Sequence, residues 1–138
     1  MESEVFVDTG FFVALASQND QHHAAATALA SRFGSGTRLV TTRAVCLEIG
    51  NTFSSAQHRA KAVELLTGIA KDSRFEIVPL SEELYREGME LFSARPDKNW
   101  SLTDCVSFLV MQNRRIRVAL TPDKHFRQAG FESLLTSR

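Results

Sequence analysis

Four carboxylates occupy positions from which they could meet in the folded chain. Asp8 and Asp123 each follow a strand-like run, whereas Glu48 and Asp104 lie early in segments with helical spacing. Carboxylate oxygens suit Mg²⁺ or Mn²⁺, while zinc prefers closely spaced Cys and His ligands, which this chain lacks. Acids gathered in an apolar crevice repel one another unless a cation holds them together. The chemistry that such a set supports is metal-assisted hydrolysis of a phosphodiester.

Asp104 lies in the stretch "SLTDCVSFLVM", residues 101–111, which is otherwise almost wholly apolar. Helical spacing places Asp104 on one face with Trp100 and Phe108, two side chains that favour burial. A carboxylate removed from water is costly unless it is paired. Ser101 offers a local explanation, because "SLTD" fits a capping box in which the carboxylate reaches back to the first amide. The metal role and the capping role are both open at this point.

The other three acids also have local alternatives. Asp8 could cap the helix that follows it. Asp123 could interact favourably with the helix dipole at the second position of a helix opened by Pro122. Glu48 could be a half-exposed residue at the edge of the fold. The conjunction of all four acids at one edge is what favours the metal site over these separate explanations.

Strand-like and helical segments alternate along the whole chain. The expected strands are residues 4–8, 37–42, 75–80, 115–121 and 131–135, and the expected helices are 9–17, 18–33, 43–56, 58–73, 81–94, 101–113 and 122–129. Continuously apolar strands favour a parallel sheet covered by helices on both faces. We therefore expect an α/β fold, a three-layer α/β/α sandwich with a central five-stranded, mainly parallel sheet. Ligands of such sheets bind beyond the carboxyl ends of the strands, where the strand order reverses, and the four acids map to that edge.

Composition narrows the possible classes of protein. The chain has 138 residues, 43% of them hydrophobic, and no linker or repeat, so residues 1–138 are expected to form a single domain. No apolar run is long enough to span a membrane, no export signal is visible and the two cysteines are isolated, which favours a cytoplasmic protein with reduced thiols. Formal net charge is zero, so a nucleic-acid partner must be bound locally and not by a global basic field.

Together these residues resemble a known family, the PIN domain, and within it the VapC-type toxins of toxin–antitoxin pairs. The resemblance covers nearly the whole chain. It rests on "VFVDTGFFVAL" at the start, Glu48 in the helix after "LVTT", "WSLTDCVSFLVM", and "ALTPDKHFRQAGF" near the end. The last two blocks, at their distance from each other, are the specific part of the match.

The resemblance implies a Mg²⁺- or Mn²⁺-dependent endoribonuclease whose acidic quartet binds the metal. Carried onto this sequence, the quartet is Asp8, Glu48, Asp104 and Asp123. The implied reaction is in-line attack of a metal-activated water on an RNA phosphate, which leaves 5′-phosphate and 3′-hydroxyl ends. Many members of the family carry a further acid close after the last one, whereas the residue two positions on in this chain is His125, so the strength of a second metal site is left open.

Further residues and partners follow from the same resemblance. Thr9 and Thr103 match hydroxyl positions that help to place metal-bound water or a phosphate, although each could simply satisfy the start of a helix. Arg114, Arg115 and Lys124 are candidates for contact with the RNA backbone; the alternative is that they form a solvated face. The implied partners are RNA, a cognate antitoxin whose carboxyl-terminal segment covers the metal site, and a second copy of the chain, with no membrane.

Two other classes of function compete with the nuclease. A receiver-type signalling domain is also a five-stranded α/β unit that holds Mg²⁺ with acids, but it needs an acidic pair after the first strand and a phosphoacceptor Asp after the middle one. Here the first strand ends in the single acid Asp8 and the third ends in "IVPL". A PIN-like module that only binds a partner is the second alternative, and the presence of all four acids argues against it.

Overall fold

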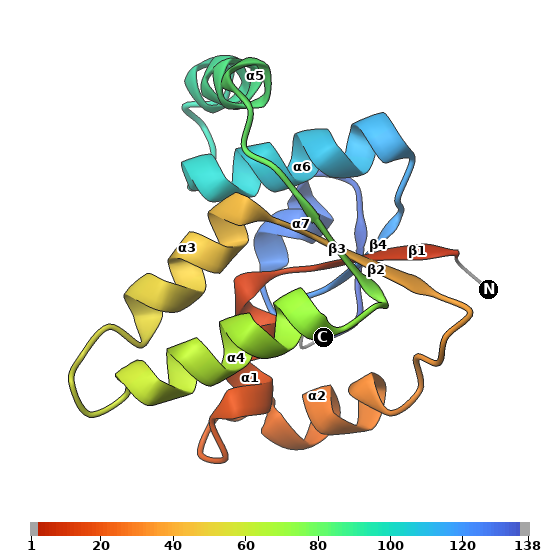
Figure 1. Cartoon of the computed structure of the whole chain (residues 1–138). Coiled ribbons are helices and arrows are strands. Elements are labelled where there is room, and N and C mark those ends of the chain that lie inside the picture. Colours follow the sequence, from red (N-terminus) through yellow and green to blue (C-terminus); the bar gives the residue numbers. More distant parts are fainter. Residues whose placement is uncertain (1–2, 136–138) are drawn as a thin grey trace.

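The fold is built on five parallel strands. The computed structural model of the chain describes residues 3–135. The strands are β1 (Glu4–Val7), β2 (Arg38–Thr42), β3 (Phe75–Val78), β4 (Val118–Leu120) and β5 (Glu132–Ser133). They lie in the order β3-β2-β1-β4-β5, and every pairing among them is parallel. The expected five-stranded α/β sandwich is confirmed (Figure 1).

Seven helices connect and cover these strands within the described residues. They are α1 (Thr9–Ala16), α2 (His23–Ala30), α3 (Arg43–Thr52), α4 (Arg59–Lys71), α5 (Glu82–Ala94), α6 (Leu102–Arg114) and α7 (Lys124–Gln128). The helix expected from residue 18 begins later, because turns occupy the residues before His23. Among residues 3–135, none of the helices has the length and apolar character needed to cross a bilayer.

Side chains alternate between the two faces of the sheet and join each face to its own helices. On one face Phe6 contacts Phe126 of α7, with 6.0 Å between the ring centroids, and Phe126 meets Phe108 of α6 edge to face at 5.0 Å. On the other face Phe75 of β3 contacts Phe12 of α1, at 5.7 Å between centroids. In Figure 1, α5 and α6 lie above the sheet and α1, α2 and α4 lie below it. This aromatic packing fixes the helices whose first turns carry functional side chains.

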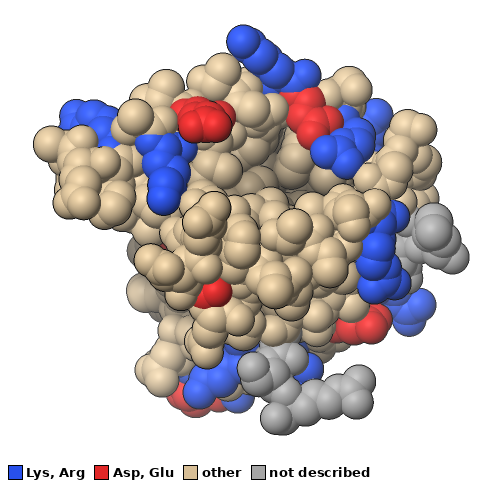
Figure 2. Space-filling model, turned by 90° about the horizontal axis from the view of Figure 1, so that it is seen from below, with Lys and Arg blue, Asp and Glu red and all other residues tan. Residues whose placement is uncertain are grey.

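An apolar cavity of about 540 Å³ lies on the α1 and α4 side of the sheet. Phe11 and Leu15 of α1, Leu65 of α4 and Phe33, which follows α2, are among its lining residues, and an ion pair between Asp72 and Arg74 stands at its margin. Figure 2 looks onto this side of the molecule and shows a largely uncharged surface with Lys, Arg, Asp and Glu around the margins. None of the four candidate carboxylates lines this cavity.

Candidate metal and active site

The strand order reverses between β1 and β4, and the candidate site lies at their carboxyl ends. The chain runs outward from β1 through β2 to β3 on one side, and from β4 to β5 on the other. The main-chain N–H of Asp8 donates to the carbonyl of Leu120 at 3.2 Å, so the two strands are still held together where they end. Such a switch point is where open parallel sheets bind ligands. Asp8 follows β1 directly, and Asp123 follows β4.

Asp8 is a buried carboxylate whose side chain is free of a helix-capping role. Its backbone stands at the N-cap of α1, but the side chain makes no capping hydrogen bond, so the capping explanation is wrong. Thr121 Oγ1 instead donates to Asp8 Oδ2 at 3.0 Å. Burial raises the pKa of Asp8 to about 7, and the negative charge of Asp104 adds to the increase. The fold therefore holds this carboxylate where its charged form is unfavourable without a cation.

Asp104 forms the capping box that its sequence context suggested, and its carboxylate also lies at the candidate site. Ser101 Oγ accepts from the Asp104 amide at 3.0 Å, and Asp104 Oδ2 accepts from the Ser101 amide at 3.0 Å, which completes a capping box at the start of α6. The carboxylate is nevertheless buried, and burial is the main cause that raises its pKa. The charge of Asp123 raises the pKa further, while hydrogen bonds from Ser101 and His125 lower it.

Glu48 reaches the site from α3, whose start is fixed by the hydroxyl of Thr42 accepting from the Val45 amide at 3.0 Å. Its carboxylate is partly buried and accepts a hydrogen bond from Thr9 Oγ1. Burial raises the pKa of Glu48, as does the charge of Asp104, whereas hydrogen bonds from the hydroxyls of Thr9 and Thr103 lower it. Thr9 and Thr103, singled out from the sequence, thus both contact Glu48. Glu48 is half-buried, as a residue at the edge of the fold would be, but its carboxylate is engaged by the site.

The Asp123 carboxylate is held by a main-chain amide at the start of α7. Its Oδ1 accepts from the His125 amide at 2.8 Å, which makes Asp123 the N-cap of the helix. The expectation that Pro122 opens this helix, with Asp123 at its second position, is wrong, since α7 begins at Lys124. Asp104, Asp123 and His125 each offer a ligand atom, and these atoms lie within 4.8 Å of one another.

A close approach of α1 to the segment after β4 shapes this edge of the site. A Cβ atom on Gly10 would lie 2.7 Å from Cδ of Pro122. Only a residue without a side chain therefore lets the first turn of α1 meet the proline that precedes Asp123. The contact fixes the separation between the segments that carry Asp8 and Asp123.

The donor set fits a hard divalent cation. Each of Asp8, Glu48 and Asp104 has its pKa raised by burial and by the charge of at least one other member of the quartet. Among the ion pairs within residues 3–135, none joins a quartet carboxylate to a Lys or Arg side chain. A cation that takes oxygen ligands, such as Mg²⁺ or Mn²⁺, would supply the missing positive charge.

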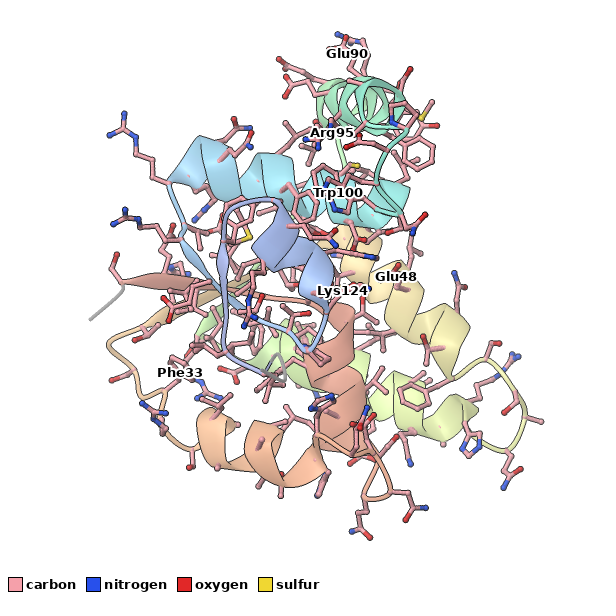
Figure 3. The ribbon with its side chains drawn as sticks, turned by 180° about the vertical axis from the view of Figure 1, so that it is seen from behind. Phe33, Glu48, Glu90, Arg95, Trp100 and Lys124 are labelled. Carbon is pink, nitrogen blue, oxygen red and sulfur yellow. The ribbon has the colours of Figure 1, made fainter. Side chains whose placement is uncertain are left out.

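The basic residues proposed from the sequence do not gather at the carboxylates. Arg114 ends α6, about 15 Å along the helix axis from Asp104, and pairs with Glu4 at 2.6 Å and Glu76 at 2.9 Å. Arg115 is the C-cap of α6, in the left-handed conformation with φ of 58°. Lys124 alone of these three lies beside the quartet, next to Asp123; Figure 3 shows Lys124 on α7 and Glu48 on α3.

Trp100 is part of the packing around the start of α6. Its ring is buried edge to face against Phe108, with centroids 5.0 Å apart, and Nε1 donates to Gln128 Oε1 at 3.1 Å. The guanidinium of Arg95 lies 5.0 Å from the ring centroid, and Figure 3 shows the two side chains next to each other. The burial expected for Trp100 from its position near Asp104 is thus confirmed by these contacts.

Thr121 was not identified from the sequence. Its buried hydroxyl donates to Asp8 Oδ2 and accepts from the Asp123 amide, each at 3.0 Å, so it links the acids that follow β1 and β4. The only signal available was its place directly after an apolar strand, a position that many threonines share without any such role.

Comparison with known proteins agrees with this geometry. The PIN domain family model matches residues 5–132. The chain belongs to the PIN domain family. Over 129 residues it is 27% identical to the 23S rRNA-specific endonuclease VapC20 of Mycobacterium tuberculosis, covering 92% of this chain and 95% of VapC20. The resemblance to the PIN domain and to VapC-type proteins, expected from the sequence, is confirmed.

Solved structures of PIN proteins share the fold. The crystal structure of M. tuberculosis VapC20, described as a Sarcin-Ricin loop cleaving toxin, aligns with a TM-score of 0.84 at 24% identity, over 92% of this chain and 95% of that one. FitAcB from Neisseria gonorrhoeae aligns with a TM-score of 0.68 at 12% identity, over 94% and 95%. VapBC2 from Rickettsia felis, bound to a DNA fragment from its promoter, aligns with a TM-score of 0.66 at 13% identity, over 94% and 96%.

Proposed function

We propose that this PIN domain is a Mg²⁺- or Mn²⁺-dependent endoribonuclease that acts as the toxin of a toxin–antitoxin pair. One observation carries the proposal: Asp8, Glu48, Asp104 and Asp123, from four separate segments, converge at the switch point of the sheet without a Lys or Arg partner among the described ion pairs. The similarity to an endonuclease named for 23S rRNA supports RNA as the substrate.

The four acids would hold the metal, and neighbouring donors orient them. The Ser101 amide donates to one oxygen of Asp104, and the His125 amide donates to one oxygen of Asp123. The hydroxyl of Thr121 donates to Asp8, and that of Thr9 donates to Glu48. When bound, a divalent ion supplies activated water and stabilises charge on the leaving oxygen of the phosphodiester. The burial of Asp8 and Asp104 excludes water from their sides of the site, which strengthens the attraction between the carboxylates and the ion.

RNA has to be bound by local contacts, because the chain has a formal net charge of zero. Lys124 is adjacent to Asp123 and is the basic residue that we assign to the RNA backbone near the cleaved bond. Arg114 is already engaged by two glutamates at the far end of α6, so we assign it to the fold and not to the substrate.

An antitoxin and a second copy of this chain are the proposed protein partners. The antitoxin is supported by the similarity to VapC20 and by the fold shared with the VapBC2 complex. We expect the product of the neighbouring open reading frame to bind the chain and to suppress its nuclease activity; failure to bind in a pull-down counts against the antitoxin. Sedimentation velocity of the purified chain tests the homodimer.

The receiver domain is not favoured by any contact at this edge. The carboxyl end of β3 is followed by Pro79 and Leu80, so it offers no phosphoacceptor acid. Incubation with acetyl phosphate should therefore leave the chain unlabelled.

The proposed activity is tested with tag-free protein and total cellular RNA. We expect discrete cleavage with Mg²⁺ or Mn²⁺, loss of cleavage with a chelator, and 5′-phosphate and 3′-hydroxyl ends at the mapped sites. Intact 23S rRNA is the first substrate to map, because the relative is named for it. RNA that stays uncut at stoichiometric protein and millimolar metal would overturn the proposal.

A further inference from the structure

The imidazole of His125 lies between two of the candidate metal ligands. Its Nδ1 is 3.0 Å from Asp104 Oδ2 and 3.2 Å from Asp123 Oδ1. Asp104 belongs to the first turn of α6 and Asp123 is the N-cap of α7, so the ring joins segments that are 19 residues apart in the sequence. The side chain is 20% exposed, which leaves its position set by these contacts and not by solvent.

The contacts distinguish the two oxygens of each carboxylate. Asp104 Oδ2 accepts from the Ser101 amide and faces the His125 ring, while Asp123 Oδ1 accepts from the His125 amide and faces the same ring. Both near neighbours of Nδ1 are acceptors, which favours the hydrogen on Nδ1. One oxygen of each acid is therefore occupied by N–H donors, and the other, Oδ1 of Asp104 and Oδ2 of Asp123, remains to bind a cation.

We propose that His125 is a positioning residue for the metal centre, whose Nδ1–H bridges Asp104 and Asp123 and orients their remaining oxygens toward one ion. The inference rests on the proposed metal site and adds a residue outside the acidic quartet. Two adjacent carboxylates repel each other, and a shared N–H donor offsets part of that repulsion before the ion arrives. Donors that hold metal-ligating side chains typically change metal affinity by about 10–100-fold when they are removed.

Substitutions of His125 can keep or remove the hydrogen-bond donor between the two acids. The amide nitrogen of Asn lies at the same distance along the side chain as Nδ1 of His, so His125→Asn keeps a donor between the two acids. His125→Leu places a methyl group there, and His125→Phe keeps the ring shape without any donor. His58→Leu, at an exposed histidine before α4, is the control for loss of an imidazole elsewhere.

The test is the affinity for Mn²⁺, measured by isothermal titration calorimetry on tag-free protein without RNA. We expect the dissociation constant of His125→Leu and of His125→Phe to rise about 10–100-fold, and those of His125→Asn and His58→Leu to stay within about threefold of wild type. Circular dichroism of the metal-free variants confirms folding, and Phe replaces Leu if the Leu variant does not fold. Donorless variants with wild-type affinity would overturn the proposal, as would an Asn variant as weak as the Leu variant.

A spectroscopic measurement separates positioning from direct ligation. Electron spin echo spectra of the Mn²⁺-loaded wild type should lack the coupling of a directly bound imidazole nitrogen, and its presence would overturn the bridging role. The role of His125 and the nuclease activity are tested separately. If wild type cleaves RNA with metal but His125→Leu binds Mn²⁺ as well as wild type does, only the proposed role of His125 is overturned. If the variants show the expected Mn²⁺ affinities but the wild type does not cleave RNA, only the nuclease proposal is overturned. A wild type that binds no Mn²⁺ removes both.

Discussion

Thr121 Oγ1 donates a 3.0 Å hydrogen bond to Asp8 Oδ2, across 113 positions of sequence. The same hydroxyl accepts from the amide of Asp123 at 3.0 Å, so one buried group connects the acids that follow the two strands at the switch point. The sheet places the main chains of β1 and β4 side by side, and Thr121 then fixes how the acidic side chain of one strand is oriented relative to the segment that follows the other.

Replacing Thr121 with Val should therefore weaken both catalysis and stability. Valine has the same shape but leaves Asp8 without its donor and the Asp123 amide without its acceptor. We expect a loss of about 1–3 kcal/mol in the free energy of unfolding and a fall of about 10–100-fold in metal affinity and RNA cleavage. The matched control is Thr41→Val, which removes a buried hydroxyl that donates to the Val7 carbonyl at 2.8 Å. It should lower stability while leaving metal affinity near wild type; equal metal affinity in both variants would contradict the role of Thr121.

The raised pKa of Asp8 predicts how the stability of the metal-free protein depends on pH. Burial raises the pKa of Asp8 to about 7 in the folded protein, against 3.8 for the same carboxyl group in water. Between these values the folded state binds more protons than the unfolded state, so the free energy of unfolding falls as pH rises from about 4 to 7. The upper limit of this loss for one buried acid is roughly 4 kcal/mol. Mg²⁺ or Mn²⁺ should restore the loss above pH 7.

Urea unfolding at pH 5, 6, 7 and 8, with a chelator and then with Mn²⁺, checks this prediction. Asp8→Asn removes one titrating group and should make the pH dependence of the metal-free protein shallower, leaving the part that comes from the raised pKa values of Glu48 and Asp104. It should also reduce the stabilisation by Mn²⁺ at pH 8. If the metal-free wild type instead became more stable between pH 5 and 7, the raised pKa of the buried Asp8 would be contradicted.

The contact of Gly10 with Pro122 predicts that an added methyl group disturbs the site. In Gly10→Ala the Cβ would lie 2.7 Å from Pro122 Cδ, so α1 or the Asp123 segment has to move. Overpacking of this kind costs about 1–3 kcal/mol, and RNA cleavage should fall with it. In Gly50→Ala, in the interior of α3, the added Cβ has open space, and alanine favours the helix by up to about 1 kcal/mol. Comparison of both variants in thermal unfolding and RNA cleavage checks the contact.

Arg114 and Lys124 should differ in what their removal changes. Arg114→Gln breaks the pairs with Glu4 and Glu76, which span α6, β1 and β3, and should lower the free energy of unfolding by about 1–2 kcal/mol. Its RNA cleavage per folded molecule should be unchanged. Lys124→Gln should instead weaken RNA binding, and the dependence of binding on salt should become less steep. An Arg114 variant with normal stability and weak RNA binding would reverse this assignment.

The sequence predicted those parts of the site that depend on short-range patterns or strand order. The capping box of Ser101 and Asp104 is visible because its partners are three residues apart, and the placement of Asp8 and Asp123 follows from the strands that precede them. Both features need only local geometry and the rule that parallel strands end at one edge.

What the sequence left undetermined depends on side-chain contacts between distant segments. The glutamates that bind Arg114 are 110 and 38 positions away, so no pattern near Arg114 distinguishes it from a basic residue available to RNA. His125 was visible as a replacement for an acid, but its place between Asp104 and Asp123 depends on the angle at which α7 meets α6. Thr121 has the same limitation, because hydroxyls after strands are common and only packing selects one of them.

Asp104→Asn tests the central claim most directly, since asparagine keeps an oxygen that can accept from the Ser101 amide while it removes the charge. The measurement is single-turnover cleavage of RNA in Mn²⁺, with Ser101→Ala as the control that weakens the cap, at about 1 kcal/mol, and retains the carboxylate. The account predicts that the folded Asp104→Asn protein loses cleavage while Ser101→Ala keeps it. Cleavage by folded Asp104→Asn at the wild-type rate would contradict the assignment of this carboxylate as a metal ligand.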